Sequence, residues 1–204
     1  MRYFVLVLAL LGISQPGAAG AQMLSGPSLA KALQGGGYVL VMRHAASPMT
    51  PPSAAEADPG NPNHERQLDA SGKTAAVAMG AAIGKLHIRI GKVWSSPTYR
   101  ALETARLAGL PKPRSAPELG DHGQSMTAAA ADQSTWLKAK AAERPRAGTD
   151  NILITHFPNI AAAFGQAAQG LGDGEALVLE PDGKRQATLV ARIPMTEWPK
   201  LSGG

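Results

Sequence analysis

Two apolar runs of strand length in this chain each end at a histidine. Residues 38–42 read Tyr-Val-Leu-Val-Met and lead into Arg43-His44, and residues 151–155 read Asn-Ile-Leu-Ile-Thr and lead into His156. A short, continuous apolar run is typical of a strand buried on both faces, as in a parallel sheet. Because ligands of such sheets bind beyond the carboxyl ends of the strands, we expect both imidazoles at one edge of the sheet.

Helical patterns alternate with strand patterns along the rest of the chain. Helices are expected over residues 28–35, 73–86, 98–108, 126–143 and 159–169, and further strands over 93–94, 176–180 and 188–193. Pro111, Pro113 and Pro117 are expected to prevent regular structure up to Glu118, and residues 47–62 predict a long surface loop. The alternation predicts an α/β fold, a three-layer α/β/α arrangement with a mainly parallel central sheet.

The N-terminal 21 residues have the pattern of a secretory signal peptide. Arg2 supplies the positive charge, residues 3–13 form the apolar segment, and Ala19-Gly20-Ala21 supplies the small residues of a cleavage site. The apolar segment is short for a membrane-spanning helix, which needs about 20 residues; a retained N-terminal anchor is the alternative. We therefore expect an exported, periplasmic protein in which residues 22–204 form one domain, with no stable membrane insertion after cleavage.

Composition excludes several kinds of chemistry. The chain has no cysteine, which rules out disulfides, thiolate metal sites, iron–sulfur clusters and cysteine nucleophiles. Its 20 Lys and Arg residues outnumber 15 Asp and Glu residues, which favours an anionic ligand. The basic residues are spread singly along the chain and aromatic residues are few, so nucleic acid is not an expected partner.

Basic and nucleophilic groups are predicted to converge at the sheet edge. A third strand end supplies Ser95-Ser96-Pro97, with Arg100 in the first turn of the next helix. Guanidinium groups offer planar sets of donors that match phosphate oxygens, and a neutral imidazole can attack phosphorus. Two histidines with Arg43 and Arg100 therefore predict an anion site with a nucleophile in it. Taken singly, each of these residues can also be a structural or capping residue.

These motifs resemble those of the histidine phosphatase superfamily, also called phosphoglycerate-mutase-like or acid phosphatase proteins. The resemblance is carried by Arg-His-Ala at residues 43–45 (Arg-His-Gly in the family), Leu68 with Ser71-Gly72, residues 95–105 and Thr155-His156. It spans about residues 38–193. Within the superfamily the chain is similar to small bacterial members without a cap domain, which have a Thr-His-x-x-Asn segment and a later Gly-Glu, here Asn159 and Gly174-Glu175.

The resemblance implies roles for individual residues. His44 is the implied nucleophile that becomes phosphohistidine, and Arg43 and Arg100 are implied to hold the phosphoryl oxygens. His156 is implied to donate to the same oxygens as charge develops. The arginines and the second histidine supply the neutralisation, so neither a metal nor another cofactor is implied.

The proton donor stays open at this point. Asp121, within the segment 120–123, matches the position of the family's acid, although it can equally form a turn; Glu118 lies near enough to compete. Four further residues are candidate substrate contacts: Ser47, Glu103, Asn159 and Glu175. Ser47 can instead simply start the loop, and Glu175 can simply start a strand. Glu103 is expected to hold Arg100 in place in preference to contacting substrate.

The expected activity is hydrolysis of a small phosphomonoester through a covalent phosphohistidine. A hydrolase is favoured over a mutase because a mutase must keep its phosphoryl group from water, and export separates the chain from glycolytic substrates. A sugar phosphate of the cell envelope is one substrate hypothesis. The alternatives are a catalytically silent phosphate-binding protein and an envelope interaction protein on the same fold.

Overall fold

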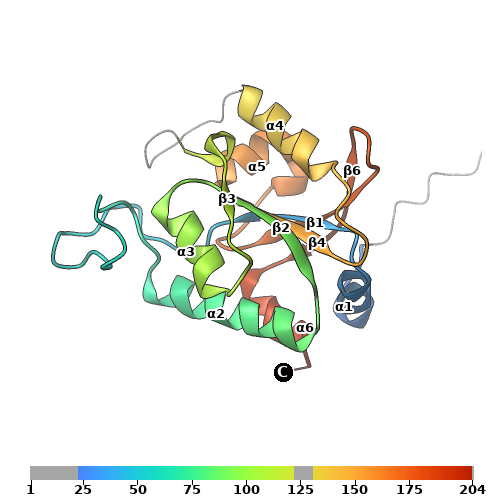
Figure 1. Cartoon of the computed structure of the whole chain (residues 1–204), viewed down its shortest axis with the longest axis horizontal. Helices are drawn as coiled ribbons and strands as arrows, with labels where there is room; N and C mark the ends of the chain where they lie inside the picture. Colours follow the sequence, from blue (N-terminus) through green and yellow to red (C-terminus); the bar gives the residue numbers. More distant parts are fainter. Residues whose placement is uncertain (1–22, 122–130, 204) are drawn as a thin grey trace, which may run out of the picture.

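The computed structural model describes residues 23–121 and 131–203. A six-stranded sheet in the order β3-β2-β4-β1-β5-β6 lies between two layers of helices (Figure 1). The strands are β1 (Val39–Arg43), β2 (Ile90–Ser95), β3 (Arg114–Ser115), β4 (Asp150–Thr155), β5 (Ala176–Pro181) and β6 (Ala187–Ile193). Strands β1, β2, β3 and β4 run parallel to one another, and β5 is antiparallel to both of its neighbours, β1 and β6. The predicted α/β fold with a mainly parallel sheet is confirmed.

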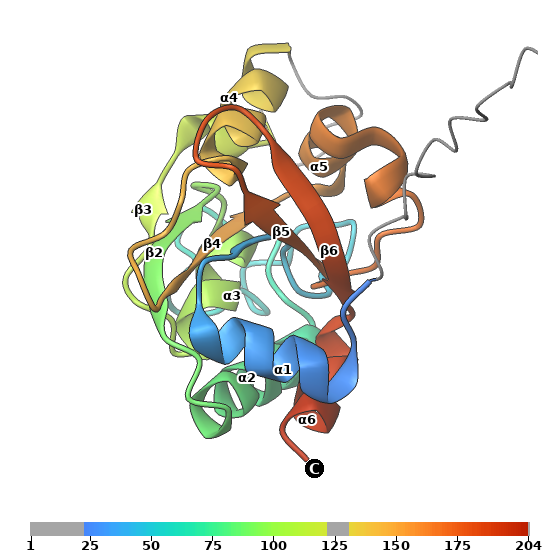
Figure 2. The ribbon, with the colours of Figure 1, turned by 90° about the vertical axis from the view of Figure 1, so that its right-hand side faces the viewer.

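The helices cover both faces of the sheet (Figures 1 and 2). They are α1 (Gly26–Gly35), α2 (Ala70–Lys85), α3 (Tyr99–Leu107), α4 (Ala131–Ala141), α5 (Phe157–Phe164) and α6 (Trp198–Leu201), with short 3-10 turns η1 (Pro117–Leu119), η2 (Gly165–Ala168) and η3 (Met195–Glu197). Alternate residues of β1 face opposite layers: Leu40 and Met42 pack with α1, α2 and α3, and Val39 and Val41 pack with α4 and α5. This explains why the first four residues of β1 are all apolar.

Local structure differs from the sequence expectation in two places. The Pro-rich stretch is not irregular: Arg114 and Ser115 form a two-residue strand beside β2, and Pro117 begins η1. Both are compatible with the prolines, because the strand residues keep their N–H groups and proline suits the first position of a helical turn. Helix α2 begins earlier than predicted, since the Asp69 carboxylate accepts the N–H of Gly72 and caps it.

The sheet register brings the three predicted motif segments to one edge. Arg43 pairs with Thr155 across β1 and β4, and Ser95 pairs with Ile154 across β2 and β4. The next residue of each strand is therefore His44, His156 or Ser96, and all three leave the sheet at its carboxyl edge.

No helix within the described residues combines the length and apolar character needed to cross a bilayer. The predicted signal peptide, residues 1–21, lies outside the described residues.

A buried carboxyl group lies at the opposite end of β4. Asp150 is fully buried and accepts the backbone N–H of Tyr38 at 2.9 Å, and burial raises its pKa to about 7. The folded chain therefore keeps this proton at pH values where the unfolded chain has lost it, so stability falls as pH rises from about 4 to about 7. We expect Asp150→Asn to flatten this dependence and to raise the free energy of unfolding at pH 8 by about 3 kcal/mol.

Urea unfolding at pH 5 and pH 8 measures this effect. Glu180→Gln removes an exposed carboxylate from the same sheet and serves as the control; it is expected to leave the pH dependence unchanged. Equal losses of stability between the two pH values in wild type and Asp150→Asn would contradict the prediction.

Candidate active site

His44 is held in one orientation and one protonation state. Its Nδ1 lies 2.7 Å from the carbonyl oxygen of Ala45, which only accepts, so Nδ1 carries the proton. Its Nε2 accepts from Nε of Arg100 at 3.1 Å, and therefore carries a lone pair. Burial, followed by the neighbouring His156, lowers the pKa of His44 well below its usual value. The ring is thus a neutral imidazole with an unprotonated Nε2, which is the form that acts as a nucleophile.

His156 lies beside this nucleophile, with its ring centroid 5.2 Å from that of His44. Its Nδ1 is 3.2 Å from Nη2 of Arg100, and its Nε2 is 2.9 Å from Oγ of Ser96. Because arginine only donates, Nδ1 accepts and Nε2 donates to the serine. Burial, and then the charge of Arg100, lower the pKa of His156 to about 3. Both ring nitrogens are engaged within the protein, so His156 orients Arg100 before any ligand is present.

Arg100 connects the whole site. It contacts both histidines and forms a buried ion pair with Asp121, in which the two side chains are 1% and 4% exposed. Its Nη1 is buried and has no hydrogen-bond partner among residues 23–121 and 131–203. Leaving a buried cationic donor unsatisfied is costly. An incoming anion would supply the missing acceptor.

The backbone around His44 is fixed by its neighbours. The N–H of Ala45 donates to Oγ1 of Thr104 at 3.1 Å, and this hydroxyl donates to the carbonyl of Arg100 at 2.8 Å. On the other side α2 closes against the next residue: a Cβ on Gly72 would lie 2.2 Å from the carbonyl oxygen of Ala46. Glycine at position 72 is therefore required by the close approach of two backbones beside the nucleophile.

Two charged residues at the site were missed by sequence reasoning. Asp173 forms an ion pair with Arg43, with Oδ1 2.7 Å from Nη2. Arg66 is 5% exposed, and its pKa is lowered by burial and then by the charge of Arg100, whereas the negative charges of Asp121 and Asp173 act in the opposite direction. The available signals were positional, since Arg66 precedes the Leu68 and Ser71-Gly72 motif and Asp173 precedes Gly174-Glu175.

Asn159 reaches the site through the backbone. Its side-chain nitrogen donates to the carbonyl of Gly120 at 3.0 Å and to Oγ1 of Thr155 at 2.8 Å. The Gly120 carbonyl also accepts from the side-chain nitrogen of Gln133 at 3.1 Å. Both amides therefore fix the residue before Asp121, and the structure gives Asn159 a positioning role in place of the predicted substrate contact.

The other predicted contacts lie elsewhere. Glu103 bonds through both carboxylate oxygens to Arg106, at 2.7 Å each, so the predicted contact with Arg100 is wrong. Residues 103 and 106 lie one helical turn apart on α3, so the exposed guanidinium of Arg106 is within reach of the buried Glu103 carboxylate. Glu175 pairs with Arg192 of β6 at 2.7 Å and does not point at the nucleophile.

Ser47 and Glu118 lie near the site without contacting His44. The Ser47 hydroxyl is 3.3 Å from the carbonyl oxygen of Pro48, and its own carbonyl accepts from Nη2 of Arg66 at 3.3 Å. Glu118 is half-buried within η1, three residues before Asp121. Of the two carboxylates considered for proton transfer, Asp121 is the one that contacts Arg100.

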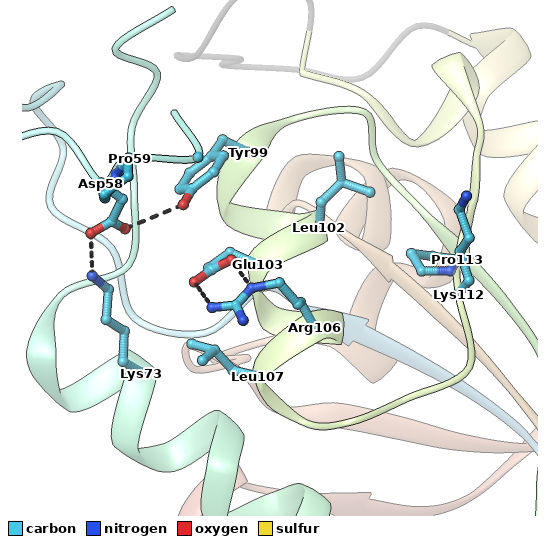
Figure 3. A pocket seen from close by; sticks show the side chains of 11 residues that line it. Asp58, Pro59, Lys73, Tyr99, Leu102, Glu103, Arg106, Leu107, Lys112 and Pro113 are labelled. Atoms are coloured by element: carbon cyan, nitrogen blue, oxygen red, sulfur yellow. Dashed lines mark hydrogen bonds and ion pairs between the residues drawn. The ribbon is translucent and has the colours of Figure 1, made fainter. Parts of the chain in front are cut away.

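A cavity of about 610 Å³ lies between α3 and the segments that contain residues 58–60 and 112–113 (Figure 3). Tyr99, Leu102, Leu107 and Pro113 give it apolar walls, and its rim holds the ion pairs Asp58–Lys73 and Glu103–Arg106. Neither histidine lines this cavity. The catalytic groups are therefore separate from the cavity, although Tyr99 and Arg100 are adjacent in sequence.

No protein-family model and no curated protein sequence matches this chain. Solved structures do match. The chain has the fold of the phosphoglycerate-mutase-like histidine phosphatases, with a mainly parallel six-stranded sheet and helices on both faces.

Three of the matching structures are SixA proteins. The protein histidine phosphatase SixA complexed with tungstate has 19% sequence identity and a TM-score of 0.57, over 78% of this chain and 98% of that one. A putative phosphohistidine phosphatase SixA from Agrobacterium tumefaciens has 17% identity and a TM-score of 0.54, with the same coverage. A third, from Nakamurella multipartitia, has 20% identity and a TM-score of 0.53, over 77% of this chain and 95% of that one. At sequence identities this low, the structural similarity establishes a shared fold and no more.

Proposed function

We propose that this chain is a metal-independent phosphatase that works through a covalent phosphohistidine on His44. The observation that carries the proposal is the buried Nη1 of Arg100, which lacks a partner within the described part of the chain and belongs to the guanidinium that contacts the unprotonated Nε2 of His44. A phosphoryl group between them would give Nη1 its acceptor and present phosphorus to the lone pair. The matching fold supports the same conclusion.

The residues allow a balanced two-step reaction. In the first step the Nε2 lone pair of His44 forms a bond to phosphorus, the bond to the leaving oxygen breaks, and Asp121 supplies the proton that oxygen takes. In the second step water gives its proton back to Asp121 and attacks phosphorus, and the N–P electron pair returns to Nε2. Arg43 and Arg100 hold the phosphoryl oxygens throughout, since this chemistry depends mainly on positioning and charge stabilisation.

A phosphohistidine substrate is a second candidate, favoured by the ion pair of Asp121. A carboxylate held by Arg100 is ionised and is a weak proton donor until that contact is exchanged. Substrates whose leaving group needs no proton from the enzyme are therefore favoured. A phosphohistidine whose other ring nitrogen already carries a proton is one of them, because the ring then takes the N–P electron pair and leaves as neutral imidazole. SixA, the histidine phosphatase with a similar fold, is named for that substrate.

The substrate and the location stay part of the proposal. The N-terminal signal pattern and the basic composition support an exported, periplasmic enzyme acting on a small phosphomonoester, with sugar phosphates of the cell envelope as the first candidates. A purified enzyme that cleaves nucleotides but no sugar phosphate would contradict this choice.

Turnover and trapping together test the proposed activity. Hydrolysis of p-nitrophenyl phosphate is measured with EDTA present across pH 4 to 8, and labelled enzyme is quenched in alkali and in acid. A phosphoenzyme stable in alkali and labile in acid is expected, because the bond is N–P. If the protein binds phosphate but shows no turnover over the whole pH range, it is a catalytically silent phosphate-binding protein and the proposed activity is wrong.

Two substrates with different leaving groups test whether Asp121 is the proton donor. We expect Asp121→Asn to lower kcat about 10²-fold or more on an alkyl phosphate, whose alkoxide needs a proton, and much less on p-nitrophenyl phosphate. Glu118→Gln is the matched control and should affect both substrates equally little. A larger, leaving-group-dependent loss in Glu118→Gln would assign the acid to Glu118.

A further inference from the structure

The ion pair between Arg43 and Asp173 lies on a turn that is fixed from several sides. The N–H of Gly174 donates to the carbonyl of His44 at 2.9 Å, and the N–H of Arg43 donates to the carbonyl of Glu175 at 3.2 Å. The turn is thus bonded directly to the backbone of the two residues that carry the predicted chemistry. Asp173 is presented to Arg43 by these bonds.

Glu175 stabilises the same turn from behind. Its Oε2 accepts the N–H of Gly172 at 2.8 Å, and its Oε1 accepts from Nε of Arg192 at 2.7 Å. Arg192 in turn donates through Nη1 to the carbonyl of Gln169 at 2.8 Å. The charge of Glu175 is therefore balanced by Arg192 on β6. Asp173 is the carboxylate of this turn that pairs with Arg43 at the site.

Five charged side chains act on one another around the two neutral histidines. Arg43, Arg66 and Arg100 are positive, and Asp121 and Asp173 are negative; the charges of the other four all shift the pKa of Arg66. Three positive and two negative groups leave a formal charge of 3 − 2 = +1. A phosphomonoester carries one or two negative charges, with a second pKa near 6.

We propose that Asp173 is a specificity-determining residue, which fixes Arg43 in place and limits the positive charge of the site so that a singly charged phosphoryl group is favoured over a doubly charged one. This inference rests on the proposed phosphatase function. Asp173 contacts Arg43 through one guanidinium nitrogen, Nη2, and leaves the other donors of that group available for a ligand. The charged groups that face Asp173 are Arg43 from β1 and Arg66 from the segment before α2.

Two substitutions separate the charge of Asp173 from its positioning of Arg43. Asp173→Asn keeps the shape and an acceptor oxygen but removes the charge, and is expected to tighten binding of inorganic phosphate about threefold to fivefold at pH 8, where the ligand is mainly the dianion. At pH 5, where it is the monoanion, the change should be less than twofold. Asp173→Ala also frees Arg43, and is expected to lower kcat about tenfold while KM does not rise.

Calorimetric titration of inorganic phosphate into the full chain at pH 5 and pH 8 tests the inference. Asp182→Asn is the matched control, because it removes an equal charge from the hairpin turn at the far end of β5. A ratio of the two affinities that is the same in wild type, Asp173→Asn and Asp182→Asn would overturn the inference. The measurement needs no turnover, so a wild type that binds phosphate without hydrolysing it contradicts the proposed activity alone, whereas no binding at either pH overturns both.

Discussion

Replacing His44 by alanine is expected to lower kcat on p-nitrophenyl phosphate by about 10⁴-fold or more, since a covalent route disappears with its nucleophile. The structure supplies the reason: Nε2 is the unprotonated nitrogen, fixed by the Nδ1 contact with Ala45 and by Arg100. The variant removes no charge, because the His44 ring is neutral. Phosphate binding should therefore survive, and steady-state rates with EDTA present combined with calorimetry would separate the two effects.

His87→Asn is the control for this experiment. His87 is an exposed histidine with a positive φ of 54°, a conformation that asparagine tolerates. Its replacement should leave kcat unchanged. Retention of more than about a hundredth of the wild-type rate in His44→Ala would exclude a covalent intermediate on this residue.

Arg100→Ala is expected to produce the second large loss, about 10³-fold in kcat/KM. Removing one donor to a developing oxyanion costs about 10²-fold to 10³-fold, and Arg100 also orients both histidines. The same change removes the buried ion pair between Arg100 and Asp121, which should lower the free energy of unfolding by about 3 kcal/mol. Kinetics and urea unfolding measure the two losses.

A double variant shows that these losses have different origins. In Arg100→Ala with Asp121→Asn the buried negative charge is gone, so most of the stability should return. Activity is measured on p-nitrophenyl phosphate, on which Asp121→Asn alone should cost little; it should not return, because the donors to the phosphoryl group are still missing. Recovery of activity along with stability would mean that Arg100 acts only through the fold.

The strands and their ends could be predicted because strands buried on both faces need consecutive apolar residues, which are visible in the sequence. All six residues of β4 and the first four of β1 are buried, and both strands contain a continuous apolar stretch, residues 152–154 in β4 and 39–42 in β1. Chain order alone then placed His44 and His156 at the ends of these strands. Arg100 was identified from its place in the Ser-Ser-Pro motif. The order of the strands in the sheet then brought these residues together.

The pairing of charged side chains could not be predicted in the same way. Arg100 and Arg106 are both one helical turn from Glu103, and only the packed structure shows that the ion pair forms with Arg106. Arg66 and Asp173 come from segments far apart in the sequence, and they act on one site because of tertiary packing. A single charged residue in a loop carries no periodic signal.

The loop after His44 is closed at its base, which has a consequence for how such an enzyme could change. Arg66 donates to the carbonyl of Pro48 at 2.6 Å, and the N–H of Asp69 donates to the carbonyl of Ala46 at 3.1 Å. The intervening residues 49–65 thus form an excursion whose two ends are pinned together. Within it, Asp58 pairs with Lys73 and Glu65 accepts the N–H of Tyr99 at 2.9 Å. New substrate preferences could therefore be acquired by exchanging residues 49–57, which precede both contacts, without rebuilding the catalytic centre.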